Sequence, residues 1–487
     1  MTAQNMTDRN RWNALYVLCA GMLMIVLDVT VVNVALPSIQ DDLGFSQSSL
    51  AWVINAYLIA FGGLLLLSGR FGDLLGRKSV LMAGLGVFTL ASLLCGIAWS
   101  QETLVAARFI QGIGGAMTSA VILGMIFTMF PEPREQAKAI GVYGFVASAG
   151  GSIGLLAGGV LTQSINYHWI FLVNIPIGIV TAFLAQRLIP HDEGIGVEKG
   201  ADVAGAVLIT ACLMLTVYTI VSPAAEQGWG SSEALALLAL SLALLAAFIV
   251  REARAATPLM PLGIFRSRNL SGANVVQALT VAGMFGMFFL GSLYLQRVLG
   301  YDALEIGLAF LPGTLIMGTI SLRYAEKLMM RFGARRVLIP GLGLVAVGLL
   351  MFARVPVGGD YLVDVLPTMI VMSVGIGVSF PPLIALAMSG AGMEDAGLAS
   401  GLVNTSAQIG GAIGLAVLAT VSASRSEHLV ADGESAAQAL TSGYHLAFLI
   451  AAGLVVAAIA VAIAVLEPAP QMDPHGTPAG EPVAEAG

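Results

Sequence analysis

An aspartate and an arginine stand within apolar stretches of this 487-residue sequence that are long enough to cross a bilayer. Asp28 lies roughly 20 Å along the first stretch, where a carboxylate costs about 2.5–3.5 kcal/mol. We therefore expect Asp28 to face a cavity or a partner, where it can exchange a proton or pair with a cation. The alternatives are a hydrogen bond between helices and a position near the membrane edge. Arg108 does not readily lose its proton, so we expect it to act on a neighbouring carboxylate or to form a structural ion pair with the loop at 69–78.

That loop, between the apolar runs 50–68 and 79–99, holds a second group of charged residues. It combines glycines and cations with a carboxylate: Gly69, Asp73, Gly76, Arg77 and Lys78. Positive charge beside a membrane helix by itself indicates only a cytoplasmic loop. Because this rule does not explain an aspartate at fixed spacing between glycines, we expect a further role for residues 69–78, which we call the gate loop.

Composition indicates a helical protein with many membrane spans. Hydrophobic residues make up 57% of the chain and charged residues 10%, with a mean hydropathy of +0.89. A soluble chain is usually about one quarter charged. The basic residues are spread over short loops, so we expect no nucleic-acid binding. The cysteines lie in apolar runs without Cys-x-x-Cys spacing, which predicts neither a disulfide nor a metal site (Cys19, Cys95, Cys212). No signal-peptide cleavage pattern precedes the first span, so we expect that span to stay in the protein.

Fourteen apolar runs are predicted to cross the membrane as helices. They lie near 13–36, 50–69, 79–99, 103–129, 138–162, 168–189, 202–221, 232–250, 270–296, 304–325, 335–353, 361–388, 397–422 and 444–466. If both termini are cytoplasmic, the outer loops hold only Arg297, Arg354 and Arg425, and Arg108 lies within a span. The other 18 of the 22 Lys and Arg residues are then inside. This asymmetry supports both the orientation and the count.

The spans divide into two bundles of six with two additional helices between them. We predict a cytoplasmic N-terminus (1–12), a first bundle (13–189), a linker with two helices (190–269), a second bundle (270–466) and a disordered cytoplasmic tail (467–487). The segment 325–338 repeats the glycine and cations of the gate loop without its aspartate, as expected for two related halves. We therefore expect the gate chemistry in the first half.

Glycines four residues apart in the run 138–162 predict a flat helix face that a neighbouring helix can approach closely. They are Gly150, Gly154 and Gly158, followed by Gly159. Position 155 is leucine, so the helix is not forced to kink there as it would be at a proline.

These motifs resemble those of the major facilitator superfamily, and in particular its fourteen-helix drug:proton antiporter family. The gate loop is similar to the pattern Gly-x-x-x-Asp-x-x-Gly-Arg-Lys, and Arg108-x-x-Gln111-Gly112 is similar to Arg-x-x-Gln-Gly. The run from Asp28 to Pro37 resembles the first-helix motif of that family. The resemblance covers nearly all of residues 12–466 and implies that Asp28 and Arg108 take part in proton coupling, with Asp28 also recognising cationic drugs.

Two further motifs match the family with one change each. The glycine face resembles Gly-x-x-x-Gly-Pro-x-x-Gly-Gly, with Leu155 in place of the proline. The sixth helix begins with a sequence similar to Trp-Arg-Trp-x-Phe followed by Asn-x-Pro-x-Gly, with His168 in place of the arginine. A metal-binding or proton-relay role for His168 and a plain interfacial position are both open.

The resemblance implies a major facilitator fold and a proton-driven exporter of drugs, antibiotics or lipophilic metabolites in the cytoplasmic membrane, working by alternating access. Candidate pocket residues are Asn33, Tyr57, Gln111, Tyr143, Phe285, Phe289 and Gln408. We expect protons, a lipophilic small molecule and lipid as partners, no metal or cofactor besides the proton gradient, and a monomer. The alternative is a transporter of a single metabolite by uniport or symport. A membrane enzyme is a remote alternative, because no His-x-x-x-x-Asp or similar set occurs.

Overall fold

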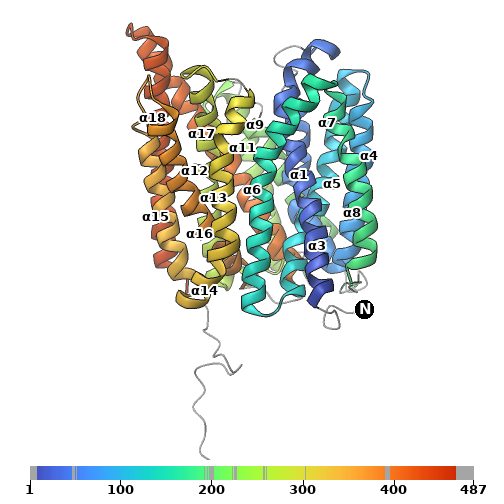
Figure 1. The fold of residues 1–487 in the computed structure, drawn as a ribbon. Coiled ribbons are helices and arrows are strands. Elements are labelled where there is room, and N and C mark those ends of the chain that lie inside the picture. The colour runs from blue at the N-terminus through green and yellow to red at the C-terminus, as the bar shows by residue number, and fades with distance from the viewer. Residues whose placement is uncertain are drawn as a thin grey trace, which may run out of the picture.

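The computed structural model consists of long helices that lie roughly parallel to one another (Figure 1). It describes residues 8–45, 50, 52–190, 192, 194, 196, 202–221, 223, 227–255, 258, 260–301, 303–389 and 395–467. Within these ranges, 13 helices are long and apolar enough to cross a membrane, and the apolar helix 204–220 is shorter. The prediction of an all-α polytopic membrane protein is confirmed. The predicted tail lies outside the described residues except for Glu467.

Residues 8–188 form the first bundle of helices. Its elements are α1 (Asp8–Leu43), α3 (Trp52–Leu75), α4 (Arg77–Gly96), α5 (Gln101–Met129), α6 (Pro133–Ser164), α7 (His168–Leu172) and α8 (Asn174–Leu188). Helix α5 packs against α3 and α4, and α1 packs against α6 and α8. Local sequence sets several helix starts: Ser100 and Thr103 form a capping box before α5, and α6 begins at Pro133.

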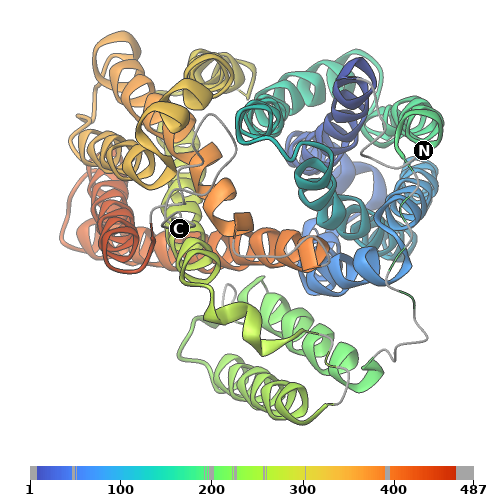
Figure 2. The same cartoon turned by 90° about the horizontal axis from the view of Figure 1, so that it is seen from below.

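Two additional helices, α9 (Val203–Val221) and α11 (Ser232–Arg254), pack against each other beside the two bundles (Figure 2). Helix α9 also contacts α3, where the rings of Trp52 and Tyr218 lie 6.0 Å apart. At the start of α9, Arg251 Nε donates to both carboxylate oxygens of Asp202, at 3.2 and 3.1 Å. This hydrogen bonding holds the pKa of Asp202 below its ordinary value. The linker to α9 is therefore joined to the end of α11.

Residues 268–464 form the second bundle, which follows the short helix η3 (Leu262–Arg266). Its elements are α12 (Arg268–Arg297), α13 (Ala303–Ile320), η4 (Ser321–Ala325), α14 (Glu326–Phe332), α15 (Ala334–Phe352), η5 (Tyr361–Val365), α16 (Leu366–Ser389), α17 (Ala396–Ala431) and α18 (Ala436–Ala464). Gly76 before α4 has φ +92°, and Gly333 before α15 has φ +83°, so the two turns adopt similar left-handed conformations. This similarity supports the internal repeat between the gate loop and residues 325–338.

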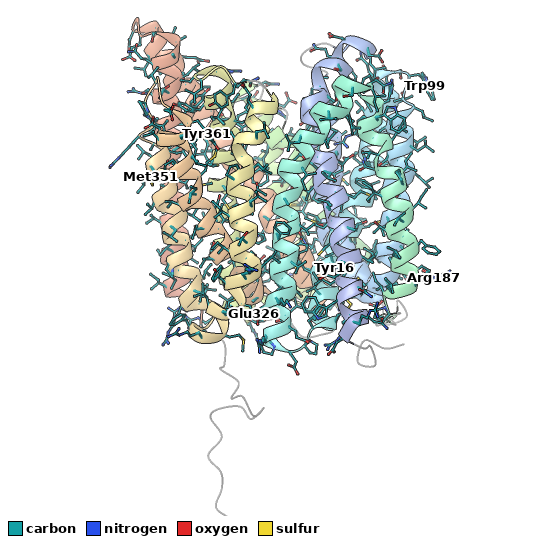
Figure 3. All side chains as sticks on the ribbon, in the orientation of Figure 1. Tyr16, Trp99, Arg187, Glu326, Met351 and Tyr361 are labelled. Carbon is teal, nitrogen blue, oxygen red and sulfur yellow. The ribbon has the colours of Figure 1, made fainter. Side chains whose placement is uncertain are left out.

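The two bundles are joined along one half of their length. Among the described residues, hydrogen bonds and ion pairs connect the bundles at Asp73–Gly397, Asp73–Leu398, Arg70–Asp395, Ser119–Asn404, Arg134–Glu326 and Gly141–Ser321. All lie toward one end of the helices, which we call the Asp73 end. Figure 3 shows Glu326 and Arg187 at this end and Trp99 and Tyr361 toward the other, the Trp99 end.

Several helices extend beyond the spans expected from hydropathy. Helix α17 has 36 residues, and at 1.5 Å per residue it measures about 54 Å, well over the ~30 Å thickness of a bilayer core. Helix α18 begins at Ala436 instead of near 444, after a capping box formed by Ser435 and Gln438. Apolar runs mark only the part of a helix that lies in lipid, whereas caps in polar sequence set where the helix ends.

Candidate functional site

Asp28 and Arg108 form a buried ion pair inside the first bundle. Arg108 Nη1 lies 2.5 Å from Asp28 Oδ2. The other carboxylate oxygen, Oδ1, accepts hydrogen bonds from Gln111 Nε2 at 2.7 Å and from Asn174 Nδ2 at 2.9 Å. Asp28 and Arg108 are each 1% exposed. Helices α1, α5 and α8 therefore bring four polar side chains together, far from water.

Further contacts fix the position of the Arg108 guanidinium. Its Nε donates to Val53 O at 2.9 Å, and Nη1 donates to Gln111 Oε1 at 2.6 Å. The guanidinium carbon lies 4.5 Å from the centre of the Tyr57 ring and 5.9 Å from that of Phe171. Cation–π contacts of this kind are strongest where the cation is desolvated. Arg108 thus pairs with Asp28, and the alternative of an ion pair with the gate loop is wrong.

The Asp28–Arg108 pair contains one group that can change its charge. Arg108 stays charged, so Asp28 is the member whose charge can change. An ionised Asp28 balances the guanidinium, whereas a protonated carboxyl group leaves a buried cation without its counter-charge, which is costly. Gln111 and Asn174 hold the carboxylate in one orientation. Proton binding at Asp28 is therefore expected to rearrange the contacts between α1, α5 and α8.

The glycines of α6 bring this helix close to α1. A Cβ atom on Gly150 would lie 2.9 Å from a side chain of α1, and one on Gly158 would lie 3.1 Å from a backbone oxygen of α1. A Cβ atom on Gly154 would collide with Thr30 Oγ1. Three of the four glycines therefore form the predicted close-packing face. Gly159 does not, because nothing lies within 4 Å of its Cβ position.

Asp73 joins the gate loop to the second bundle. Its Oδ1 accepts the N–H of Gly397 at 2.9 Å, and its Oδ2 accepts the N–H of Leu398 at 2.8 Å. Arg77 Nη2 donates to Asp73 Oδ1 at 2.8 Å. These backbone groups open α17, where free N–H groups and the helix dipole favour a carboxylate. We call Asp73, Arg77, Gly397 and Leu398 the Asp73 latch.

The other residues of the gate loop support close packing around the latch. A Cβ atom on Gly69 would lie 2.5 Å from Gly397 O, so α3 touches the backbone of α17. Gly76 has a left-handed φ, and a Cβ atom there would lie 2.5 Å from Asp192 O. Lys78 Nζ donates to two carbonyl groups at the end of α8, at 2.9 and 2.8 Å. The five gate-loop residues thus share one contact network.

The predicted pocket residues of the first bundle lie in two places. Tyr57 and Gln111 contact Arg108 and belong to the site just described. Tyr143 is buried elsewhere in α6, with its hydroxyl 3.8 Å from Met22 Sδ.

The structure does not place the remaining predicted pocket residues beside Tyr57 and Gln111. Phe285 and Phe289 are exposed on α12. Gln408 of α17 faces α3, with its Cγ 3.4 Å from the Cβ position of Gly62. The side chains of Asn33 and Leu155 lie outside the described residues, although α6 continues through position 155.

His168 lies at the Trp99 end, on the surface of the first bundle. Its ring stacks on Tyr167 with centroids 4.1 Å apart, and the Tyr167 hydroxyl donates to Asp42 Oδ2 at 2.8 Å. Burial raises the pKa of Tyr167 above its ordinary value. These residues, with Asp41, line a surface cavity of about 640 Å³. Across the described part of the chain, no group of three or more His, Cys, Asp or Glu residues could hold a metal ion.

Sequence reasoning missed two residues of the site. Asn174 lies in the Asn-x-Pro-x-Gly motif that carried the resemblance, but only the fold shows that its amide reaches Asp28. Asp192 lies in a polar segment that reads as a linker, yet its carboxylate binds the start of α4. A lone aspartate near a span end carries no periodic signal, so nothing in the sequence marked it out.

Comparison with known proteins agrees with this architecture. The profile of the Major Facilitator Superfamily matches residues 18–415. The human organic anion transporter MFSD10 shares the fold, with a TM-score of 0.65 and 16% identity over 93% of this chain and 99% of that one.

Several relatives have names that refer to antibiotics. The chain is 39% identical to a puromycin resistance protein of Streptomyces alboniger, over 92% of this chain and 90% of that protein. It is also 39% identical to a cephamycin export protein of Amycolatopsis lactamdurans, over 96% and 94%. A methylenomycin A resistance protein of Streptomyces coelicolor is 32% identical over 84% and 85%. Together with the profile match over most of the chain, these similarities show that the protein is a multi-pass membrane transporter of the major facilitator superfamily.

Proposed function

We propose that the protein exports antibiotics or similar lipophilic compounds in exchange for protons. The observation that carries this proposal is the buried Asp28–Arg108 pair, in which Asp28 is the member able to change its charge. The relatives named for puromycin resistance and cephamycin export support the class of substrate.

Asp28 is proposed to bind either a proton or a cationic substrate, but not both. When ionised and released from Arg108, it is proposed to hold a cation in the first bundle. When it takes up a proton from outside, it no longer holds the cation, which leaves on that side. The proton then leaves to the cytoplasm before the next substrate binds. Exchange of one proton for one monovalent cation moves no net charge, so the pH gradient is the proposed driving force, with about 1.4 kcal/mol for each unit of pH difference and no need for ATP.

The Asp73 latch is proposed to hold the state that is closed to the cytoplasm. The distribution of Lys and Arg supports the proposal that both termini lie inside, in the cytoplasmic membrane, and that the Asp73 end faces the cytoplasm. The two bundles are then expected to rock about the substrate site, as the latch forms and releases. We propose that a monomer does this without a bound cofactor.

Everted membrane vesicles test the exchange directly. With an imposed pH gradient, adding puromycin or a cationic dye should release protons from vesicles that contain the protein but not from matched empty vesicles. Substrate movement without proton movement would contradict antiport and favour uniport. Movement of both in the same direction would indicate symport. A resistance screen against varied antibiotics distinguishes a multidrug exporter from a transporter of one metabolite.

A further inference from the structure

We infer that Asp192 is a positioning residue of the gate, which makes the segment after the first bundle a part of the cytoplasmic closure. The segment 190–201 leads from α8 toward the additional helices and reads in sequence as a plain linker. In the structure, its described residues Asp192, Gly194 and Gly196 lie against the turn between α3 and α4. We call these three residues the clip.

Asp192 caps the start of α4 with both carboxylate oxygens. Its Oδ2 accepts the N–H of Arg77 at 2.7 Å, and its Oδ1 accepts the N–H of Lys78 at 3.0 Å. The residue that precedes α4, Gly76, has no side chain and makes no cap of its own. The first N–H groups of a helix have no partner within the helix and favour a carboxylate. Asp192 therefore supplies from 115 positions away the cap that the local sequence lacks.

The clip also holds the end of α3. The N–H of Gly196 donates to Leu74 O at 3.2 Å. A Cβ atom on Gly194 would collide with the same carbonyl oxygen. Lys78 connects the same turn to the end of α8, because its Nζ donates to the carbonyl groups of Gln186 and Ile189. Three helix ends are thus tied together at one turn.

This turn sets the position of the Asp73 latch. Arg77 has its backbone N–H on Asp192 and its guanidinium on Asp73. Asp73 in turn holds the first N–H groups of α17. A shift in the start of α4 therefore moves the guanidinium that keeps Asp73 aimed at α17. The contact is charge-assisted at every step, which makes each hydrogen bond stronger than a neutral one.

The latch makes contacts across the two bundles, whereas the hydrogen bonds of the clip to described residues lie within the first bundle. When α17 departs, Asp73 loses two N–H partners but keeps Arg77, while the contacts of Asp192 need not change. The clip is therefore expected to hold Arg77 ready for the latch to form again.

The test measures how often the contact between α3 and the start of α17, which we call the seam, opens. Ser400 lies on α17 just beyond the latch and is 0% exposed. A Ser400→Cys reporter, in a protein whose three native cysteines are replaced by alanine, is labelled by a maleimide only when the seam opens. Labelling rates are measured on detergent-purified protein, so the assay needs neither a substrate nor protons. Its result is thus independent of whether the antiport proposal is correct.

Asp192→Asn should label about tenfold faster than the parent, because the amide caps one N–H group and lacks the negative charge. Asp202→Asn is the matched control, because Asp202 is a linker carboxylate that contacts Arg251 and Gly205 instead of the gate. It should label at the parental rate. Asp192→Ser, whose hydroxyl is also neutral and stands on a shorter side chain, should increase the labelling rate at least as much and serves if Asp192→Asn does not yield monodisperse protein.

The combination with Asp73→Asn separates positioning from a general loosening of the fold. If Asp192 acts through the latch, adding Asp192→Asn to Asp73→Asn should leave the labelling rate unchanged, since coupled residues are non-additive. A further increase equal to that of Asp192→Asn alone would overturn the inference. So would a parental labelling rate in folded Asp192→Asn protein.

Discussion

At the scale of single residues, the site depends on one carboxylate and on the groups that surround it. Asp28 receives hydrogen bonds or charge from Arg108, Gln111 and Asn174, which come from two other helices. Each partner is a fixed donor, so the carboxylate is the member whose protonation can alter the network. The residue-scale prediction therefore concerns Asp28.

Asp28→Asn should abolish uphill export, because an amide is neutral like the protonated acid and can neither take up a proton nor attract a cation. The protein should still insert in the membrane. The measurement is export of a cationic dye against its gradient in cells energised only by a proton gradient, at matched expression. Asp42→Asn is the control, since Asp42 is an exposed carboxylate on the same helix that contacts Tyr167. It should export normally. Full uphill export by Asp28→Asn would move the coupling site elsewhere.

At the residue scale, the sequence predicted a contact where a physical cost required one. A carboxylate in an apolar helix is expensive, so a partner for Asp28 was expected, and the structure places Arg108 against it. Of the predicted pocket residues, Tyr57 and Gln111 contact Arg108, whereas Phe285 and Phe289 are exposed on α12. Aromatic residues in membrane helices have no such cost, so their type does not reveal which way they face.

At the scale of helices, the helix that carries Asp28 packs against α6 and α8. The glycine face of α6 lies against the helix that carries Asp28, and α1 also packs against α8, which carries Asn174. Spacing predicted the face, since glycines four apart share one side of a helix. It could not predict that Gly159 faces open space, because the orientation of a helix depends on its neighbours.

Two glycine substitutions in α6 should have opposite effects on stability. Gly154→Ala should lower the free energy of unfolding by about 1–3 kcal/mol, because its Cβ collides with Thr30 Oγ1. Gly159→Ala has free space and should be neutral or stabilising by up to about 1 kcal/mol, since alanine favours a helix more than glycine does. Melting temperatures of the purified proteins in detergent provide the comparison. Equal effects would mean that α1 and α6 do not pack along this face.

At the scale of the whole molecule, orientation in the membrane determines what the two ends do. A reporter fused after Gly487 should be active in the cytoplasm, and one inserted after Asp432, in the turn between α17 and α18, should be active outside. This expectation rests on the uneven distribution of Lys and Arg between the two sides. A C-terminus found outside would contradict the count of fourteen spans or, if the N-terminus also lies outside, the assignment of the Asp73 end to the cytoplasm.

The last prediction concerns how the two bundles stay together at the Asp73 end. Two contacts across the bundles differ in burial: the Asp73 side chain, which accepts two N–H groups of α17, is 0% exposed, whereas that of Arg134, paired with Glu326, is 77% exposed. A buried donor left without its acceptor costs about 1–3 kcal/mol, while an exposed ion pair contributes only about 0–1 kcal/mol. The latch should therefore account for most of the closure.

Asp73→Asn should cut export at least tenfold and shift the bundles toward an open cytoplasmic side, because the amide can accept only one of the two N–H groups and leaves Arg77 without its counter-charge. Glu326→Gln should leave both properties near the parental values. Spin labels at Arg187→Cys and Phe332→Cys, exposed positions on the two bundles, report the separation of their ends by pulsed electron paramagnetic resonance. Longer distances are expected in Asp73→Asn alone. If distances and export are both unchanged in that variant, Asp73 does not hold the bundles together, and the gate loop serves only to orient the protein in the membrane.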